Sequence, residues 1–151
     1  MSEPAAWRLK FAHYGSWPRT CRGAVAVEFA LVFVLFFSLF YAIVAYGLVL
    51  AIQQSLTLAA EEGARAAVKD APSAAARVAN ADAMAKSVLG WLPVDAITVS
   101  SAAAPCAADP ATPCVTVAVS YNYAGHPIVP ALPLLGIAIP ATLSATATVQ
   151  Y

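Results

Sequence analysis

The chain has 151 residues, of which 61% are hydrophobic and only 11% are charged, and its formal net charge is zero. Soluble domains carry about 25% charged residues, so this composition excludes a chain that is wholly surrounded by water. Four of the eight basic residues precede Gly23 and the remainder is mildly acidic, which excludes a basic surface that binds nucleic acid.

Residues 1–23 are polar and basic, and Pro4 and Pro18 interrupt them. We predict an unstructured leader here. From residue 24 to residue 69 the sequence contains no proline, and from Phe29 to Ala60 it contains no charged residue. A membrane core of about 30 Å needs about 20 helical residues, so residues 24–69 are predicted to form one long helix whose first half spans a membrane.

Orientation follows from the basic residues that flank this helix. Arg19 and Arg22 are expected to stay in the cytoplasm, so the C-terminal part crosses to the periplasm. The chain is therefore expected to be a single-pass protein of the inner membrane, in contact with membrane lipid.

Residues 70–151 are predicted to form the periplasmic region. Asp70 is expected to cap a second helix whose first turn contains Pro72, and Gly90 and Pro93 are expected to end it. Apolar side chains then recur at helical spacing, at Val78, Ala81, Ala85, Val88, Leu89 and Leu92.

After Pro93 the apolar period changes from helical spacing to two. Alternating side chains mark strands around Ile97 and Val99 and over residues 115–123 and 143–151. The predicted fold is therefore α+β and pilin-like, with a long N-terminal helix, a second helix and an antiparallel sheet of about three strands. The apolar loop 124–141 contains four prolines, which forbid a central strand. It is expected to cover the sheet, touch the membrane surface or meet a partner.

Few side chains in the sequence suggest catalysis. Cys106 and Cys114 flank a short turn-rich loop, and in an oxidising periplasm they are expected to form a disulfide, with two free cysteines as the alternative. His126 is the one histidine after the leader, and with the two cysteines it makes a weak metal signal without the usual spacing. We predict no enzyme, no metal and no cofactor.

Glu28 lies near the start of the apolar run, where an ionised side chain is costly unless it has a partner. Cleavage after Gly23 would make Ala24 the new N-terminus and Glu28 the fifth residue. Residues one and five share a helix face, so Glu28 would neutralise its own α-amine or that of a neighbouring chain. The simpler alternative is a carboxylate that reaches back to the membrane edge.

Two further features lie in the second half of the long helix. A strip of small residues at i+4 spacing would let another helix approach closely, although chance in an alanine-rich helix also explains it; it consists of Ser55, Ala59, Gly63 and Ala67. Glu61, Glu62 and Arg65 are expected on a solvated face, with Glu61 and Arg65 as an i,i+4 ion pair.

The "GAVAVEFAL" start and the "AAEEGARAA" end of this helix resemble the TadE-like domain of tight-adherence (Flp) pilus systems, closely over residues 22–68. The leader, Gly23 and Glu28 are similar to the class III signal of type IV pilins and pseudopilins. The resemblance implies a minor pseudopilin that a prepilin peptidase cleaves after Gly23. Its implied partners are a sister pseudopilin, the major Flp pilin and the inner-membrane assembly platform. Phe29 stands where the major pilins commonly have tyrosine, and this chain is far longer than those short pilins. Both differences favour the minor role.

A rival interpretation is a signal-anchored periplasmic binding or adaptor module that keeps its N-terminus. In that case the apolar loop 124–141 would bind a ligand or partner, and residues 1–23 would remain attached.

Overall fold

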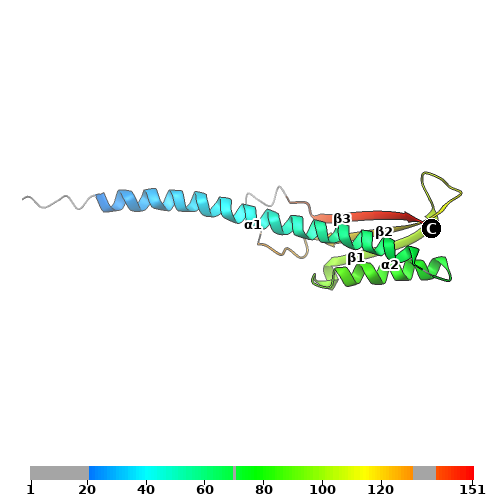
Figure 1. Ribbon diagram of the computed structural model, residues 1–151. Coiled ribbons are helices and arrows are strands. Elements are labelled where there is room, and N and C mark those ends of the chain that lie inside the picture. The colour runs from blue at the N-terminus through cyan, green and yellow to red at the C-terminus, as the bar shows by residue number, and fades with distance from the viewer. Residues whose placement is uncertain (1–20, 70, 131–138) are drawn as a thin grey trace, which may run out of the picture. The chain divides into compact units, whose positions relative to one another are not determined.

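The computed structural model describes residues 21–69, 71–130 and 139–151, and the chain divides into two compact units, Met1–Leu39 and Phe40–Tyr151. The described elements follow one another as α1 (Cys21–Val68), α2 (Ala74–Val88), the short 3₁₀ helix η1 (Val94–Ala96), β1 (Ile97–Pro105), β2 (Pro113–Asn122) and β3 (Thr142–Gln150) (Figure 1). The predicted α+β fold, with a long apolar first helix, a second helix and a three-stranded antiparallel sheet, is confirmed.

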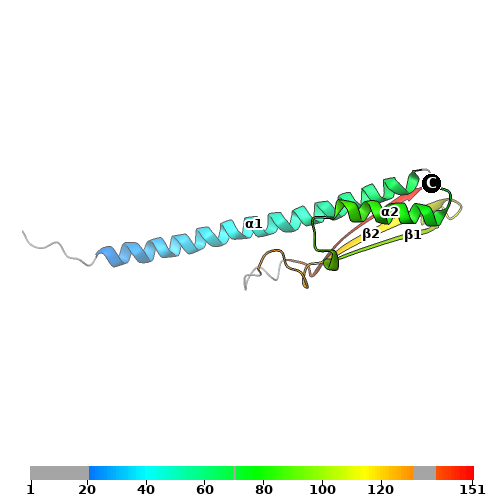
Figure 2. The same cartoon turned by 90° about the horizontal axis from the view of Figure 1, so that it is seen from below.

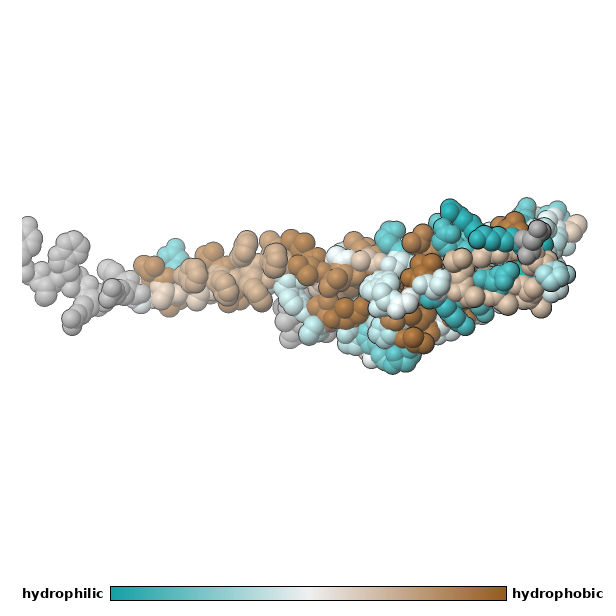
Figure 3. Space-filling view, turned by 60° about the horizontal axis from the view of Figure 1, so that its bottom comes forward, coloured by the Kyte–Doolittle hydropathy of each residue, from teal (hydrophilic) through white to brown (hydrophobic). Residues whose placement is uncertain are grey.

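In the first unit, the described residues all belong to α1. The side chains from Gly23 to Leu39 are exposed on every face of the helix, and nearly all of them are apolar. Figure 3 shows this stretch as an almost continuous hydrophobic surface. Helix α1 is long and apolar enough to cross a membrane. Among the described residues it runs from Cys21, so the part of the chain predicted to be helical from residue 24 lies wholly within it as far as Val68.

The sheet of the second unit is an antiparallel meander in the order β1-β2-β3. Its register pairs Val99 with Val119 on one side of β2, and Val119 with Ala145 on the other. This places the alternating apolar residues of the three strands on one face. On β2 that face is fully buried and contains Val115, Val117, Val119 and Tyr121. The alternation predicted for residues 115–123 and 143–151 therefore identified the core face.

The opposite face of the sheet consists of small, uncharged side chains. Across β1, β2 and β3 it presents the rows Ser100, Ala118 and Thr146, and Thr98, Ser120 and Ser144. Most of these residues are exposed, and the Thr116 and Thr148 hydroxyls lie 3.1 Å apart. A polar outer face is the ordinary counterpart of a buried inner face in an antiparallel sheet.

Both helices contribute to a single core with the inner face of the sheet (Figure 2). Helix α1 contributes seven buried residues to it and α2 contributes Ala81 and Ala85. The predicted periodicity of the second helix is confirmed at those two alanines and continues past the helix at Leu89 and Leu92. The helix side of this core is dominated by alanine, so the helix backbones lie close to the sheet.

Helix α2 begins one turn later than predicted. Ser73 is its N-cap, and the Ser73 hydroxyl oxygen accepts a hydrogen bond from the Ala76 N–H at 3.2 Å. The prediction that Pro72 occupies the first turn is wrong, because Pro72 precedes the cap; Asp70, the predicted cap, lies outside the described residues. A serine hydroxyl satisfies one of the four free N–H groups of a helix start, which explains why the helix begins there.

The loop between β1 and β2 is closed by covalent and polar contacts. The structure joins Cys106 and Cys114 in a disulfide with their Cα atoms 5.0 Å apart. Inside the loop, the Asp109 carboxylate accepts hydrogen bonds from the Ala111 N–H at 3.1 Å and from the Thr112 hydroxyl at 2.6 Å. The Thr112 and Ala111 bonds favour the ionised form and so lower the pKa of the Asp109 carboxyl.

Two glycines of α1 provide a test of this packing. A Cβ at Gly63 would lie 3.0 Å from the Ala81 carbonyl oxygen and 3.2 Å from Val117 Cγ1, whereas a Cβ at Gly47 would meet nothing within 4 Å. We expect Gly63→Leu to lower the free energy of unfolding by about 1–3 kcal/mol through overpacking. Gly47→Leu is expected to leave it unchanged or to raise it by up to about 1 kcal/mol, because leucine favours helix.

Thermal and urea unfolding in detergent, followed by circular dichroism, measures both variants. An equal loss of stability in the two would contradict close packing at Gly63.

Candidate functional site

The start of α1 carries the residues that the sequence singled out. Gly23, Ala24 and Glu28 all lie in this helix, and their side-chain positions are exposed. A Cβ at Gly23 would meet no atom within 4 Å. Among the described residues, no side chain forms an ion pair or a hydrogen bond with the Glu28 carboxylate.

The peptide bond between Gly23 and Ala24 lies within α1. Glycine costs about 1 kcal/mol relative to alanine inside a helix, so Gly23 lowers the local helix propensity beside this bond.

After Glu28 the helix carries an aromatic stripe. Phe29, Phe33 and Phe37 stack in sequence at i+4 spacing, with ring centroids 5.9 Å apart in each pair. The hydroxyl of Ser38 donates to the Val34 carbonyl oxygen at 2.7 Å, which satisfies a polar group inside the apolar stretch. All three rings are more than half exposed, so Phe29 belongs to an apolar surface that the described residues do not cover.

The strip of small residues further along α1 packs inside the chain. Ala59, Gly63 and Ala67 are buried, and Gly63 lies directly against Ala81 and Ala85 of α2. Ser55 is half-buried, and its hydroxyl donates to the Ala51 carbonyl oxygen at 2.9 Å. The close approach predicted from the strip is therefore an approach of α1 to α2 and β2 within one molecule.

The ion pair beside this strip differs from the one predicted. Arg65 Nη1 lies 3.0 Å from the Glu62 carboxylate, at i,i+3, and the predicted pairing of Glu61 with Arg65 is wrong. Both spacings bring side chains together on a helix surface. Glu62 is half-buried while Glu61 is exposed, so Arg65 pairs with the less exposed of the two glutamates.

Two side chains of α1 that the sequence analysis did not single out bond the second unit together. The Tyr41 hydroxyl donates to the Pro130 carbonyl oxygen at 2.6 Å, and the Gln53 amide donates to the Ser144 carbonyl oxygen at 2.9 Å. The first buried residue along α1 is Ala45. The sequence does show Tyr41 as a polar group inside an apolar run and Gln53 as the first side-chain amide after it. It does not show which carbonyl oxygen accepts from either.

Arg77 is a second residue that the sequence analysis missed. Its guanidinium donates to the Ala67 carbonyl oxygen at 2.9 Å, near the end of α1, and lies 4.5 Å from the centre of the Tyr151 ring. A cation near a helix C-terminus interacts favourably with the unpaired carbonyl groups there. Arg77 thus joins α1, α2 and the residue after β3.

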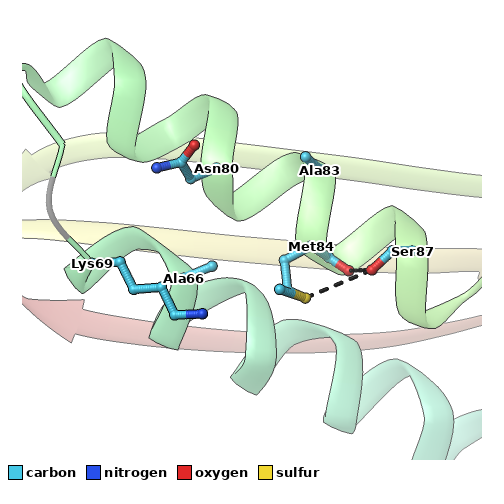
Figure 4. Close-up of a pocket in the computed structure, with 6 residues that line it drawn as sticks. All are labelled: Ala66, Lys69, Asn80, Ala83, Met84 and Ser87. Atoms are coloured by element: carbon cyan, nitrogen blue, oxygen red, sulfur yellow. Dashed lines mark hydrogen bonds between the residues drawn. The ribbon is translucent and has the colours of Figure 1, made fainter.

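A groove between the end of α1 and α2 has a volume of about 480 Å³ (Figure 4). Its lining offers the Lys69 amine, the Asn80 amide and the Ser87 hydroxyl, together with apolar groups of Ala66, Ala83 and Met84. The Ser87 hydroxyl already donates to the Met84 carbonyl oxygen at 2.7 Å. The described lining contains no carboxylate, imidazole or thiol.

Cys106, Cys114 and His126, the weak metal signal of the sequence, do not come together as a set of ligands. The described residues contain no group of three or more side chains that could hold a metal ion, and both cysteines are joined to each other. His126 faces Asp95 instead, with Nε2 3.6 Å from the carboxylate oxygen. The Tyr121 hydroxyl donates to the His126 carbonyl oxygen at 2.7 Å, and burial raises the pKa of this hydroxyl, so it remains a neutral donor.

Comparison with known families identifies the first helix. Residues 23–65 match the family model described as TadE-like protein. The TadE-like segment of the chain is thus residues 23–65, which lie within α1. The match confirms the resemblance over these residues, and the family supports involvement in tight-adherence pilus systems and a structural or assembly role. No curated protein sequence and no solved structure is detectably similar to the chain.

The TadE-like segment spans both environments of α1. Its first part is the exposed apolar helix that carries Gly23 and Glu28, and its last part is the strip that packs on α2 at Gly63. The motif "AAEEGARAA" thus corresponds to a packing surface, since six of its nine residues are buried: Ala59, Ala60, Gly63, Ala64, Ala66 and Ala67.

Tyr41→Phe tests the bond between α1 and the loop after β2. We expect loss of this hydrogen bond to lower the free energy of unfolding by about 0.5–1.5 kcal/mol and to accelerate amide hydrogen exchange over residues 123–130. Tyr46→Phe is the matched control, because Tyr46 is exposed and its hydroxyl has no hydrogen bond within the described part of the chain. Identical exchange profiles for the two variants would show that the Tyr41 bond does not hold the loop.

Proposed function

We propose that the protein is a minor pseudopilin that takes part in assembling a tight-adherence, Flp-type pilus. The observation that carries this proposal is the start of the TadE-like segment, where Gly23 is followed by an uncovered apolar helix with one carboxylate, Glu28. A prepilin peptidase would cleave after Gly23. The mature chain would remain in the inner membrane through the first half of α1, with the rest of the protein in the periplasm.

The electrostatics of the helix start support processing at this position. Cleavage would create a protonated α-amine on Ala24, whose pKa is near 8 in model peptides. Positions one and five of a helix lie on one face, and the helix dipole adds a positive field at the N-terminus. Glu28 would then have a cationic partner either in its own chain or in a neighbour, which favours lateral assembly over a dispersed state in lipid.

The covered and uncovered parts of α1 support the same division of roles. From Gly23 to Leu39 the side chains are exposed and no described residue covers them, whereas from Ala45 onward one side of the helix packs on the rest of the second unit. The uncovered part is free to meet lipid or neighbouring apolar helices. Its partners in assembly would be a sister pseudopilin, the major Flp pilin and the membrane assembly platform.

Gly23→Asp tests the processing step. In cells that contain the pilus system, we expect this variant to keep residues 1–23, because a charged side chain beside the cleaved bond obstructs a site that needs a small residue. Gly90→Asp, a substitution at another exposed glycine, is expected to mature normally. Intact mass and N-terminal sequencing of the membrane-extracted protein distinguish the two forms. Retention of Met1 in the unsubstituted protein would favour a signal-anchored module.

Glu28→Gln tests the assembly step, since it keeps the shape of the side chain and removes its charge. We expect this variant to insert and mature normally but to crosslink to neighbouring pilin-like chains about tenfold less, because a charge-assisted hydrogen bond contributes about 1.5–3 kcal/mol. Glu61→Gln, at an exposed glutamate of the same helix, is the control. Equal photo-crosslinking of the two variants would remove Glu28 from the assembly contact.

A further inference from the structure

The second unit has one end at which both of its longer described connections meet. The register pairs Ile97 with Tyr121 and Asn122 with Thr142, so β1 starts, β2 ends and β3 starts at the same end of the sheet. The connection from α2 to β1 and the described ends of the connection from β2 to β3 therefore share this end. We call residues 89–96 and 123–130 the Tyr41 end, because Tyr41 donates its hydrogen bond to Pro130 there.

Exposed apolar side chains gather at the Tyr41 end. Outside α1, the described residues of the second unit expose four large apolar side chains, and Trp91, Val94 and Ile128 are three of them. Trp91 is 58% exposed and Val94 is 84% exposed. A hollow of about 140 Å³ next to Val94 is lined by Leu89 and Ile97, and Lys86 contributes to its wall. The remaining side chain, Tyr151, lies against Arg77.

The position of Tyr41 along α1 sets the level of this end relative to a membrane. Counting from Ala24, Tyr41 is the eighteenth residue, and a helix needs about 20 residues to cross a hydrocarbon core of about 30 Å. Among the described residues, the exposed side chains of α1 between Tyr41 and Leu50 are apolar apart from the Tyr46 hydroxyl. A membrane-spanning α1 that starts at Ala24 would therefore place the loop bonded to Tyr41 near the outer boundary of the bilayer.

We propose that the Tyr41 end is seated in the outer interface of the membrane, with Trp91, Val94 and Ile128 in contact with lipid. This inference rests on the proposed membrane anchorage of α1. Tryptophan and tyrosine favour the headgroup level, where an apolar ring and a polar N–H or O–H both find partners, and Tyr46 of α1 is exposed near the same level. The Lys86 ammonium complements the phosphates of the headgroups.

The charges at this end are few. Asp95 and His126 face each other across the two connections, with His126 Nε2 3.6 Å from the Asp95 carboxylate oxygen, and Lys86 lines the hollow beside Val94. The backbone of the short connection is bonded internally as well, with the Leu92 N–H donating to Leu89 and the Ala96 N–H donating to Pro93. Such internal bonds reduce the cost of placing a turn near hydrocarbon.

Trp91 itself provides the probe for this proposal. The sequence has three tryptophans, and the other two, Trp7 and Trp17, lie in the leader. The full chain with Trp7→Phe and Trp17→Phe, reconstituted in phosphatidylcholine and phosphatidylglycerol vesicles, reports on Trp91 alone. We expect a blue-shifted emission and about twofold quenching when the lipids carry bromine near the headgroup end of their acyl chains.

The matched control moves the tryptophan to the other end of the sheet. In the same background, Trp91→Phe is combined with Ala107→Trp, in the exposed loop beyond β1. The nine residues of β1 rise about 30 Å, so this tryptophan is expected to emit as in water and to escape quenching.

Each outcome of the experiment has a defined meaning. Quenching of Trp91 that persists as the lipid-to-protein ratio is raised supports the lipid seat. A blue shift without bromine quenching, or one that disappears on dilution in lipid, would mean that a second protein copy covers Trp91 and would overturn it. Vesicle flotation separates the two proposals. A chain that floats while Trp91 behaves like Ala107→Trp contradicts the seat alone, whereas a chain that does not float contradicts the anchor.

Discussion

The contact of α1 with α2 and β2 at Gly63 is the constraint on which the second unit depends. At this point a carbonyl oxygen of α2 and a valine methyl of β2 come within 3.0–3.2 Å of the place where a Cβ would be. Interiors are packed as densely as organic crystals, so a helix can approach this closely only if its facing residues are small. The alanines around Gly63 meet that demand, and the core of the second unit follows from it.

The same helix serves two different environments. Toward its N-terminus, α1 is apolar on all sides and exposed, while toward its C-terminus it is apolar on one side and carries charges such as Glu61 and Arg65 on the other. A helix that is hydrophobic all round needs lipid or other helices, and an amphipathic one needs a domain. Near Ala45, helix α1 therefore changes from a candidate membrane span to a helix with one buried side.

Much of the fold could be predicted because its signals are periodic. The alternation of Val115, Val117 and Val119 fixed the buried face of β2, and the proline-free apolar run fixed the long helix. Contacts between distant residues could not be predicted. The sequence shows that Tyr41 and Gln53 can donate hydrogen bonds, but it does not show which carbonyl oxygens the fold brings within reach of them. The cap was misplaced because Asp70, Pro72 and Ser73 all suit a helix start. Cleavage after Gly23 and the pairing of Glu28 stay predictions, since both depend on molecules outside the chain.

The outer face of the sheet has a consequence for recognition. Its rows of threonine, serine and alanine contain no ionisable group, and after Asp109 the sequence has no Asp, Glu, Lys or Arg at all. Dissolved salt therefore has no surface charge to screen there. A molecule that docks there is selected by its shape and by its hydrogen bonds to hydroxyl groups, and the strength of that docking is nearly independent of ionic strength.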